Sequence, residues 1–267
     1  MPSNAQIFLL IVAIAFFAIG GALSYARLWR NGNSMRIGGK ACLYSGVVTA
    51  VAVLVWHSAT RGRWLPIGDN FDALIWLAVL LALFAAYVQR RRPLAALDWF
   101  IMPVVILLLA GAAVFGKTVF HPYVGRAWTS VHILTSFVGF AAFAIAAAGG
   151  ALYVYAAAKL RRKQPVGSYL GSLERLEHLT MTSVTLGFPL LTISIIIGTI
   201  ELIAQDRPTP VTKIALAACV WVVYAIVLHA PMNPVFRGRR AAVLSVVGFI
   251  LMIGALVAAQ FVPGGSR

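Results

Sequence analysis

The chain has 267 residues, of which 61% are hydrophobic and only 11% are charged. Soluble domains average about 45–50% apolar and about 25% charged residues, so this composition excludes an ordinary soluble protein. The net charge of +15 would suggest nucleic acid as the partner of a soluble protein. In so apolar a chain, the positive charge is better explained by loop lysines and arginines, which fix the orientation in the membrane and contact anionic lipid. We therefore expect a multi-span membrane protein that binds no nucleic acid.

Eight apolar segments are long enough, or nearly so, to cross a bilayer as helices, since about 20 residues span a hydrocarbon core of about 30 Å. Only helices and closed barrels satisfy their backbone in lipid, and no segment alternates like a barrel strand. The sequence therefore predicts an all-α bundle of about eight transmembrane helices, forming one domain over residues 1–267. The expected spans are Ala5–Leu28, Ala41–Ala59, Ala73–Val88, Trp99–Gly116, Val131–Leu160, Thr180–Ala204, Val211–His229 and Ala241–Val262.

The distribution of lysine and arginine predicts the orientation. Of the 22 basic residues, fifteen follow the first, third, fifth and seventh spans, and seven lie on the other side. Because cytoplasmic loops carry the excess of Lys and Arg, both termini are expected on the outer, periplasmic side of a bacterial inner (plasma) membrane. The start "MPSNAQ" lacks the positive charge of a signal peptide, so the first span is expected to be retained.

The usual motifs of enzymes are missing from the sequence. It contains no P-loop, no GxGxxG, no G-x-S-x-G and no H-E-x-x-H. The motifs that usually carry ATP hydrolysis, hydride transfer and zinc proteolysis are therefore absent from the sequence. We therefore expect no enzyme and no catalytic residue. Cys42 and Cys219 form no metal-binding spacing and are expected to pack as small apolar residues.

Two histidines are expected at the same depth near the outer boundary of the bilayer. His57 ends the second span and His132 begins the fifth. Two neutral imidazoles at one depth on facing helices can ligate one haem iron. The alternative is a pair of interfacial histidines wetted by lipid headgroups beside Trp56 and Trp128.

The other three histidines have plainer explanations, although a ligand role is open for one. His229 closes the seventh span, and Pro231 and Pro234 indicate that the helix ends close by. Its ring could be a ligand or simply be favoured by the helix dipole. His121 is interpreted as a loop residue before a proline, and His178 as part of a solvated amphipathic face in "SLERLEHLT".

The carboxylates near the span ends are few. Glu201 ends the sixth span on the outer side, where a proton-relay role competes with interfacial snorkelling. Asp72 is placed to cap the third span, and its spacing from Asp69 does not resemble a calcium loop. An ion-coupled transporter needs buried carboxylates or broken helices, and Glu201 is the only candidate.

Four stretches in the second half of the chain occur together, in this order, in one family. They are "WTSVHILTSFVGFAAFAIAAAGGALYVY", "LEHLTMTSVTLGFPLLTISIIIGTIE", "VWVVYAIVLH" and "FRGRRAAVLSVVGFILMIGA". The chain thereby resembles the cytochrome c assembly proteins of the CcsA, ResC and HemX type, and "LPIGDNFDALIWLAVL" extends the resemblance more weakly into the first half. The segment "AQDRPTPVTK" lacks the family's tryptophan-rich loop, and the C-terminal end lacks its second outward histidine. The chain is therefore most similar to the shorter HemX and YpjD-like branch.

The resemblance implies a haem-binding or haem-handling membrane protein of cytochrome c assembly, with haem b as the cofactor. By resemblance, His132 is the outward haem ligand and His229 belongs to an intramembrane haem site whose other ligand comes from a companion protein. His57 corresponds to a histidine of the shorter branch. It is the expected partner of His132 on the iron, since the usual C-terminal histidine is absent.

The expected partners are membrane lipids, haem, and either another cytochrome c maturation membrane protein or an apocytochrome. Arg61, Arg63 and Arg126 are candidates for the haem propionates, with headgroup contact as the alternative. The competing hypothesis is a non-catalytic regulator or scaffold of tetrapyrrole synthesis. It would act through the cytoplasmic loops, above all the inner segment Arg161–Leu179.

Overall fold

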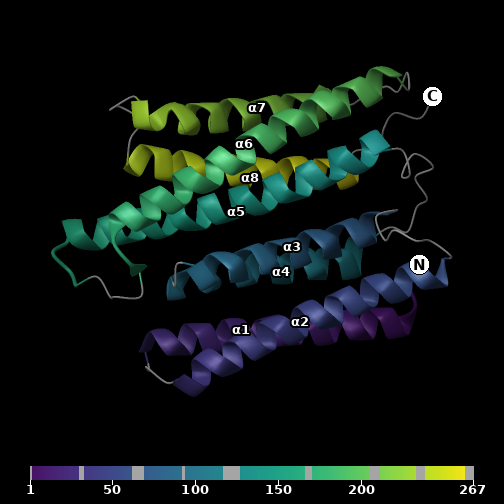
Figure 1. The fold of residues 1–267 in the computed structure, drawn as a ribbon, viewed down its shortest axis with the longest axis horizontal. Helices are drawn as coiled ribbons and strands as arrows, with labels where there is room; N and C mark the ends of the chain where they lie inside the picture. The colour runs from purple at the N-terminus through teal and green to yellow at the C-terminus, as the bar shows by residue number, and fades with distance from the viewer. Residues whose placement is uncertain are drawn as a thin grey trace. The chain divides into compact units, whose positions relative to one another are not determined.

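The computed structural model describes residues 2–29, 33–61, 69–91, 94–116, 127–165, 170–204, 211–232 and 238–261. These residues form eight α-helices (Figure 1) and contain no strand. Seven of the helices are long and apolar enough to cross a membrane, and Ile214–His229 is a shorter apolar helix. The predicted all-α membrane fold is confirmed.

The helices follow the predicted spans closely. Most starts lie within four residues of the prediction, but two helices start seven or more residues earlier, at Asn33 instead of Ala41 and at Leu173 instead of Thr180. The second early start has a local cause, because the Ser172 hydroxyl accepts the backbone N–H of Arg175 and caps the helix. The helices are α1 (Asn4–Trp29), α2 (Asn33–Thr60), α3 (Asn70–Arg91), α4 (Ala95–Phe115), α5 (Ala127–Arg161), α6 (Leu173–Ala204), α7 (Val211–His229) and α8 (Arg239–Phe261), with a 3-10 turn, η2 (Ala230–Met232), after α7.

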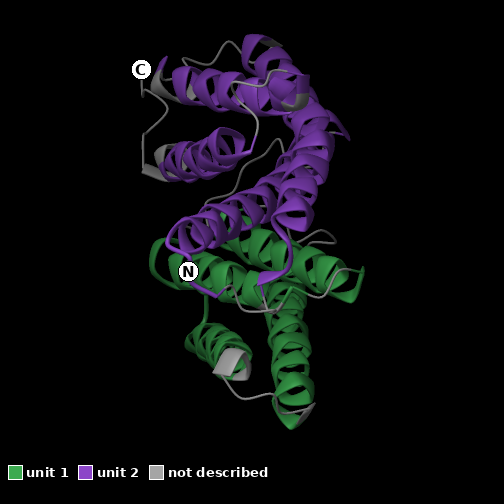
Figure 2. Cartoon of the chain, turned by 90° about the vertical axis from the view of Figure 1, so that its left-hand side faces the viewer, with its two compact units in different colours: residues 1–124 green, residues 125–267 purple. Residues whose placement is uncertain are grey.

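The chain forms two compact units, residues 1–124 and residues 125–267 (Figure 2). In the first unit, α1 packs on α2 and α4, and α3 packs on α4 and α2. The Ser24 hydroxyl of α1 donates a hydrogen bond of 3.3 Å to Asp98 of α4. The structure defines the packing within each unit. The prediction that the whole chain forms a single domain is not tested by it and stays a prediction.

Helix α5 is the centre of the second unit, with α6 and α8 packed against it. Its residues from Gly139 to Gly150 are all buried. A Cβ atom at Gly149 would lie 2.7 Å from the Thr180 Oγ1 atom of α6, and one at Gly150 would lie 2.6 Å from the carbonyl oxygen of Ala242 in α8. Small residues let transmembrane helices approach this closely. Gly149 therefore allows the close approach of α6 to α5, and Gly150 allows the close approach of α8.

Helix α7 closes the second unit by packing on α6 and α8. The buried Tyr224 ring stacks on Phe143 of α5 with ring centroids 3.6 Å apart, and its hydroxyl donates to the Ser245 carbonyl of α8. One turn earlier on α7, the Trp221 Nε1–H donates to the Thr192 hydroxyl of α6 over 3.0 Å. Helix α7 is thus held to all three of the other helices of its unit.

Candidate functional site

His132 lies in the second turn of α5, against α6. Its Nδ1 atom is 2.8 Å from the carbonyl oxygen of Ser194. A carbonyl can only accept a hydrogen bond, so Nδ1 carries the proton of the neutral ring. The lone pair is then on Nε2, and none of the hydrogen bonds formed by the described residues uses that atom. The fold therefore presents the ring in the tautomer that can ligate a metal through Nε2.

Small and hydroxylated residues of α5 and α6 hold the His132 ring in place. The Ser136 hydroxyl donates to the backbone carbonyl of His132 over 2.7 Å, and it lies 2.5 Å from the Ser194 hydroxyl. A Cβ atom at Gly198 would lie only 2.8 Å from the His132 Cε1 atom. Gly198 therefore makes room for the ring, and Ser194 and Ser136 orient it.

Sequence reasoning did not find these supporting residues. Ser194 and Gly198 are four residues apart on α6, so the helical period places them on one face. Nothing in the sequence shows that this face meets His132, which is 62 residues away from Ser194.

Glu201 lies near the end of α6, where Thr129 of α5 donates a hydrogen bond to its carboxylate. Thr129 comes one turn before His132, so this bond ties together the two helix ends that carry the site. The carboxylate is half-buried at a helix terminus, as its sequence position predicts. Its part in a proton relay stays a prediction.

His229 is the last residue of α7 and its ring is exposed. Its Nδ1 atom donates to the Ala225 carbonyl over 2.8 Å, so Nε2 again carries the lone pair. Helix α7 runs antiparallel to α6, because Trp221 contacts Thr192 near the middle of both helices and the six residues that join the two helices are too few to reach back along α6. His229 and His132 therefore lie toward opposite ends of the second unit, which makes them candidates for two separate sites.

His57 is in the first unit and has a different environment. It is buried, with 2% of its surface exposed. Its Nδ1 atom lies 3.2 Å from Oε1 of Gln6, and its Nε2 atom lies 3.5 Å from Oδ2 of Asp69. Both ring nitrogens therefore face oxygen atoms of the protein. Because His57 and His132 are in separate units, their pairing on one iron stays a prediction.

Asp69, not Asp72, caps α3. The helix begins at Asn70, and the Oδ1 atom of Asp69 accepts the backbone N–H of Asp72 over 3.0 Å. This is the hydrogen bond that an N-cap residue makes to the third residue of its helix. The prediction that Asp72 is the cap is wrong, because the helix starts at Asn70, three residues before the predicted start at Ala73.

The arginines expected near haem propionates are only partly described. Arg61 forms an ion pair with Asp69, so its guanidinium is already engaged by a buried carboxylate. Arg63, Arg126 and His121 lie outside the described residues.

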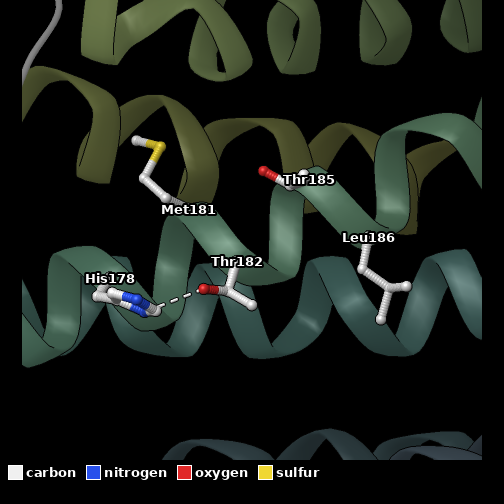
Figure 3. Close-up of a pocket in the computed structure, with 5 residues that line it drawn as sticks. All are labelled: His178, Met181, Thr182, Thr185 and Leu186. Carbon is white, nitrogen blue, oxygen red and sulfur yellow. Dashed lines mark hydrogen bonds between the residues drawn. The ribbon is translucent and has the colours of Figure 1, made fainter.

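His178 lines an open groove of about 490 Å³ on one side of α6 (Figure 3). Its ring hydrogen-bonds to the Thr182 hydroxyl one turn later, over 3.0 Å. The other lining residues, Met181, Thr185 and Leu186, follow along the same helix face. An exposed ring bonded within its own helix agrees with the interpretation of His178 as part of a solvated face.

The described helices define a multi-span membrane protein, in which the neutral His132 ring carries its lone pair on Nε2. The chain belongs to the cytochrome c assembly protein family, whose sequence profile, "Cytochrome C assembly protein", matches residues 64–262.

Relatives from several organisms agree with this membership. A "Cytochrome c biogenesis protein CcsA" of Mesostigma viride is 20% identical over 94% of this chain and 90% of its own length. The "Inner membrane protein YpjD" of Escherichia coli (strain K12) is 24% identical over 92% of this chain and 94% of its own length. A CcsA protein of Thermosynechococcus vestitus is 44% identical over a shorter part, 28% of this chain and 24% of its own length. The resemblance seen in the sequence is confirmed.

Proposed function

We propose that the protein binds or handles haem b in cytochrome c assembly, with His132 as its outward axial ligand. One observation carries the proposal: the Nδ1–H of His132 donates to the Ser194 carbonyl, which leaves Nε2 unprotonated. Metal-ligating histidines typically donate their other N–H to a carbonyl or carboxylate in this way. The residues present therefore fit a haem iron.

The protein's own residues would hold and orient the haem, which supplies the iron and its redox chemistry. The Ser194 carbonyl fixes the tautomer and Gly198 admits the ring. The chain itself is not proposed to be an enzyme. Its family and the printed name of its CcsA relatives support a role in cytochrome c biogenesis and favour it over the regulation of tetrapyrrole synthesis.

His229 is proposed as half of a second haem site toward the other end of the same unit. Its exposed ring and its bond to Ala225 leave Nε2 available to a partner. The other ligand would come from a companion membrane protein, as the resemblance implies. An apocytochrome is the expected recipient of haem on the outer side.

The proposed location is the inner membrane of a bacterium, with both termini in the periplasm. The printed name of the YpjD relative, an inner membrane protein, supports the membrane assignment. The excess of positive charge after the odd-numbered spans supports the orientation.

A pyridine haemochrome assay on the detergent-purified full chain tests the proposal. We expect a Soret band in the wild type, loss of most of it in His132→Ala, and no change in His178→Ala, which alters an exposed histidine of the same unit. His57→Ala loses the band as well only if His57 is the second ligand. A wild type without haem, or a His132→Ala variant with normal haem, would exclude the proposal.

A further inference from the structure

The Glu201 carboxylate of α6 lies at the same end of the α5–α6 pair as the His132 ring. Gly198 of α6 lies against that ring, because a Cβ atom there would be 2.8 Å from its Cε1 atom. Glu201 follows Gly198 by three residues, so the helical period places both on one face of α6, one turn apart. Thr129 precedes His132 by three residues and lies in the same way one turn nearer the start of α5.

The hydrogen bond from the Thr129 hydroxyl to Glu201 fixes the carboxylate beside this end of the site. The bond continues the contact between α5 and α6 past the ring, which is itself held by the Ser194 carbonyl over 2.8 Å. The carboxylate is half-buried, so water screens its charge only in part. A negative charge therefore lies about one helical turn from an imidazole that presents a lone pair.

No positive side chain of the described residues is paired with this negative charge. The ion pairs in the described part of the chain all lie in the first unit, and the partner of Glu201 is a neutral hydroxyl. A half-buried carboxylate attracts a positive charge more strongly than a fully hydrated carboxylate does. A cationic group bound at Nε2 of His132 would lie within reach of this attraction.

The Ser194 carbonyl acts in the same direction as the carboxylate. It accepts the Nδ1–H of His132, and a hydrogen bond of this kind raises the basicity of the ligating nitrogen. A more basic ligand donates more electron density and favours the higher oxidation state of an iron. Net charge and hydrogen bonding around an iron are two of the means by which a protein sets its reduction potential. Two features of α6 thus favour the same charge state of a bound iron.

We propose that Glu201 selects the oxidation state of the haem at His132, favouring ferric over ferrous iron. The inference rests on the haem site proposed above and adds to it a preference for one form of the ligand. Reduction adds one electron to the iron and removes one positive charge, with no bond broken, so the attraction of the carboxylate becomes weaker. A unit charge about 10 Å away, at an effective dielectric constant of about 20–80, changes the ratio of ferric to ferrous affinity roughly two- to fifteenfold.

A redox titration of the haem-loaded full chain in detergent tests the proposal, with one-electron mediators as the electron source and the Soret band as the readout. Glu201→Gln keeps the shape of the side chain and the acceptor for the Thr129 hydroxyl, and it removes only the charge. We expect the ratio of ferric to ferrous affinity to fall about fivefold, which raises the midpoint potential by roughly 40 mV. Glu201→Asp, which keeps the charge, should shift the potential by less than half as much.

Glu174→Gln is the matched control, because it removes one carboxylate from the exposed first turn of the same helix. It should leave the potential unchanged. Equal shifts in Glu174→Gln and Glu201→Gln would overturn the proposal, as would a haem-loaded Glu201→Gln protein with the wild-type potential. A Glu201→Gln variant that loses ferric and ferrous haem alike would also overturn it, since a purely structural role affects both forms equally.

Haem content per chain, measured by pyridine haemochrome absorbance, separates this inference from the proposed function. A wild type without haem refutes both. Loss of haem in His132→Ala, together with a wild-type potential in Glu201→Gln, supports the haem site and refutes only the role of Glu201.

Discussion

The His132 ring of α5 and the Ser194 backbone carbonyl of α6 are joined by a hydrogen bond of 2.8 Å. The bond passes between two helices, so the orientation of the ring depends on how α5 and α6 pack. Residues of α6 should therefore influence ligand binding through the orientation of the ring, without being ligands themselves.

Gly198→Ala should remove haem without unfolding the protein. The new Cβ would lie 2.8 Å from the His132 Cε1 atom, so the ring must leave its position against Ser194. We expect haem content to fall about tenfold, the lower range for loss of an outer contact of a metal ligand. Pyridine haemochrome absorbance per protein measures it. Gly254→Ala, where nothing lies within 4 Å of the new atom, should keep its haem; equal loss in both variants would contradict the explanation.

Gly150→Ala should destabilise the second unit. Its Cβ would lie 2.6 Å from the Ala242 carbonyl oxygen, and backbone cannot move aside as a side chain can. We expect a loss of about 1–3 kcal/mol, typical of overpacking, although alanine favours a helix over glycine by about 1 kcal/mol. Thermal unfolding in detergent, followed by circular dichroism, measures it. Gly149→Ala should cost less, because its nearest contact is a side-chain atom, Oγ1 of Thr180, which can move by a change of the Thr180 χ1 angle. A higher unfolding temperature for Gly150→Ala would refute the close approach of α5 and α8.

Thr129→Val should weaken the attachment of α5 to the end of α6. The substitution keeps the shape of the side chain but removes the donor to the half-buried Glu201 carboxylate. We expect a loss of about 1–2 kcal/mol in unfolding free energy. Thr199→Val is the matched control, since its exposed hydroxyl bonds to the Ile195 carbonyl of the same helix. Losses of the same size in both variants would show that the bond to Glu201 contributes nothing.

The charge pattern predicts a topology that fusions can test. Alkaline phosphatase is active only when it is exported, so a fusion after Lys163, following α5, should be inactive. A fusion after Asp206, following α6, should be active. The reverse pattern would place the fifteen-charge side outside and the His132 end of α5 in the cytoplasm, which would contradict the proposed role.

The sequence predicts the helices well because each span needs its own run of apolar residues. Helix α7, for example, has the predicted bounds Val211–His229. The starts of α2 and α6 are missed because polar residues continue a helix beyond the bilayer core without continuing its hydrophobic pattern. Ser172, which caps α6, and the amphipathic pattern of "SLERLEHLT" are the local signals for the second of these extensions.

The candidate sites could be predicted only in part. Histidines are conspicuous in so apolar a chain, so the sequence alone identifies His132 and His57 as candidate haem ligands. Their tautomers depend on Ser194 and Gln6, and the second of these lies 51 residues from His57 in the sequence. Contacts between helices depend on how each helix is turned about its axis, and a single sequence does not show that.

The adjacent glycines of α5 also fix the angle at which His132 points. Successive residues of a helix are about 100° apart around the axis, so Gly149 and Gly150 can face α6 and α8 together in only one rotational setting. A turn of α5 by a single residue would push Ala151 toward the Ala242 backbone in one direction and Ala148 toward Thr180 in the other. His132 and Gly149 are seventeen positions apart, which corresponds to roughly 25 Å of helix. The glycine pair thus fixes the rotation of α5 at a distance from the site and so keeps the His132 ring directed at the Ser194 carbonyl.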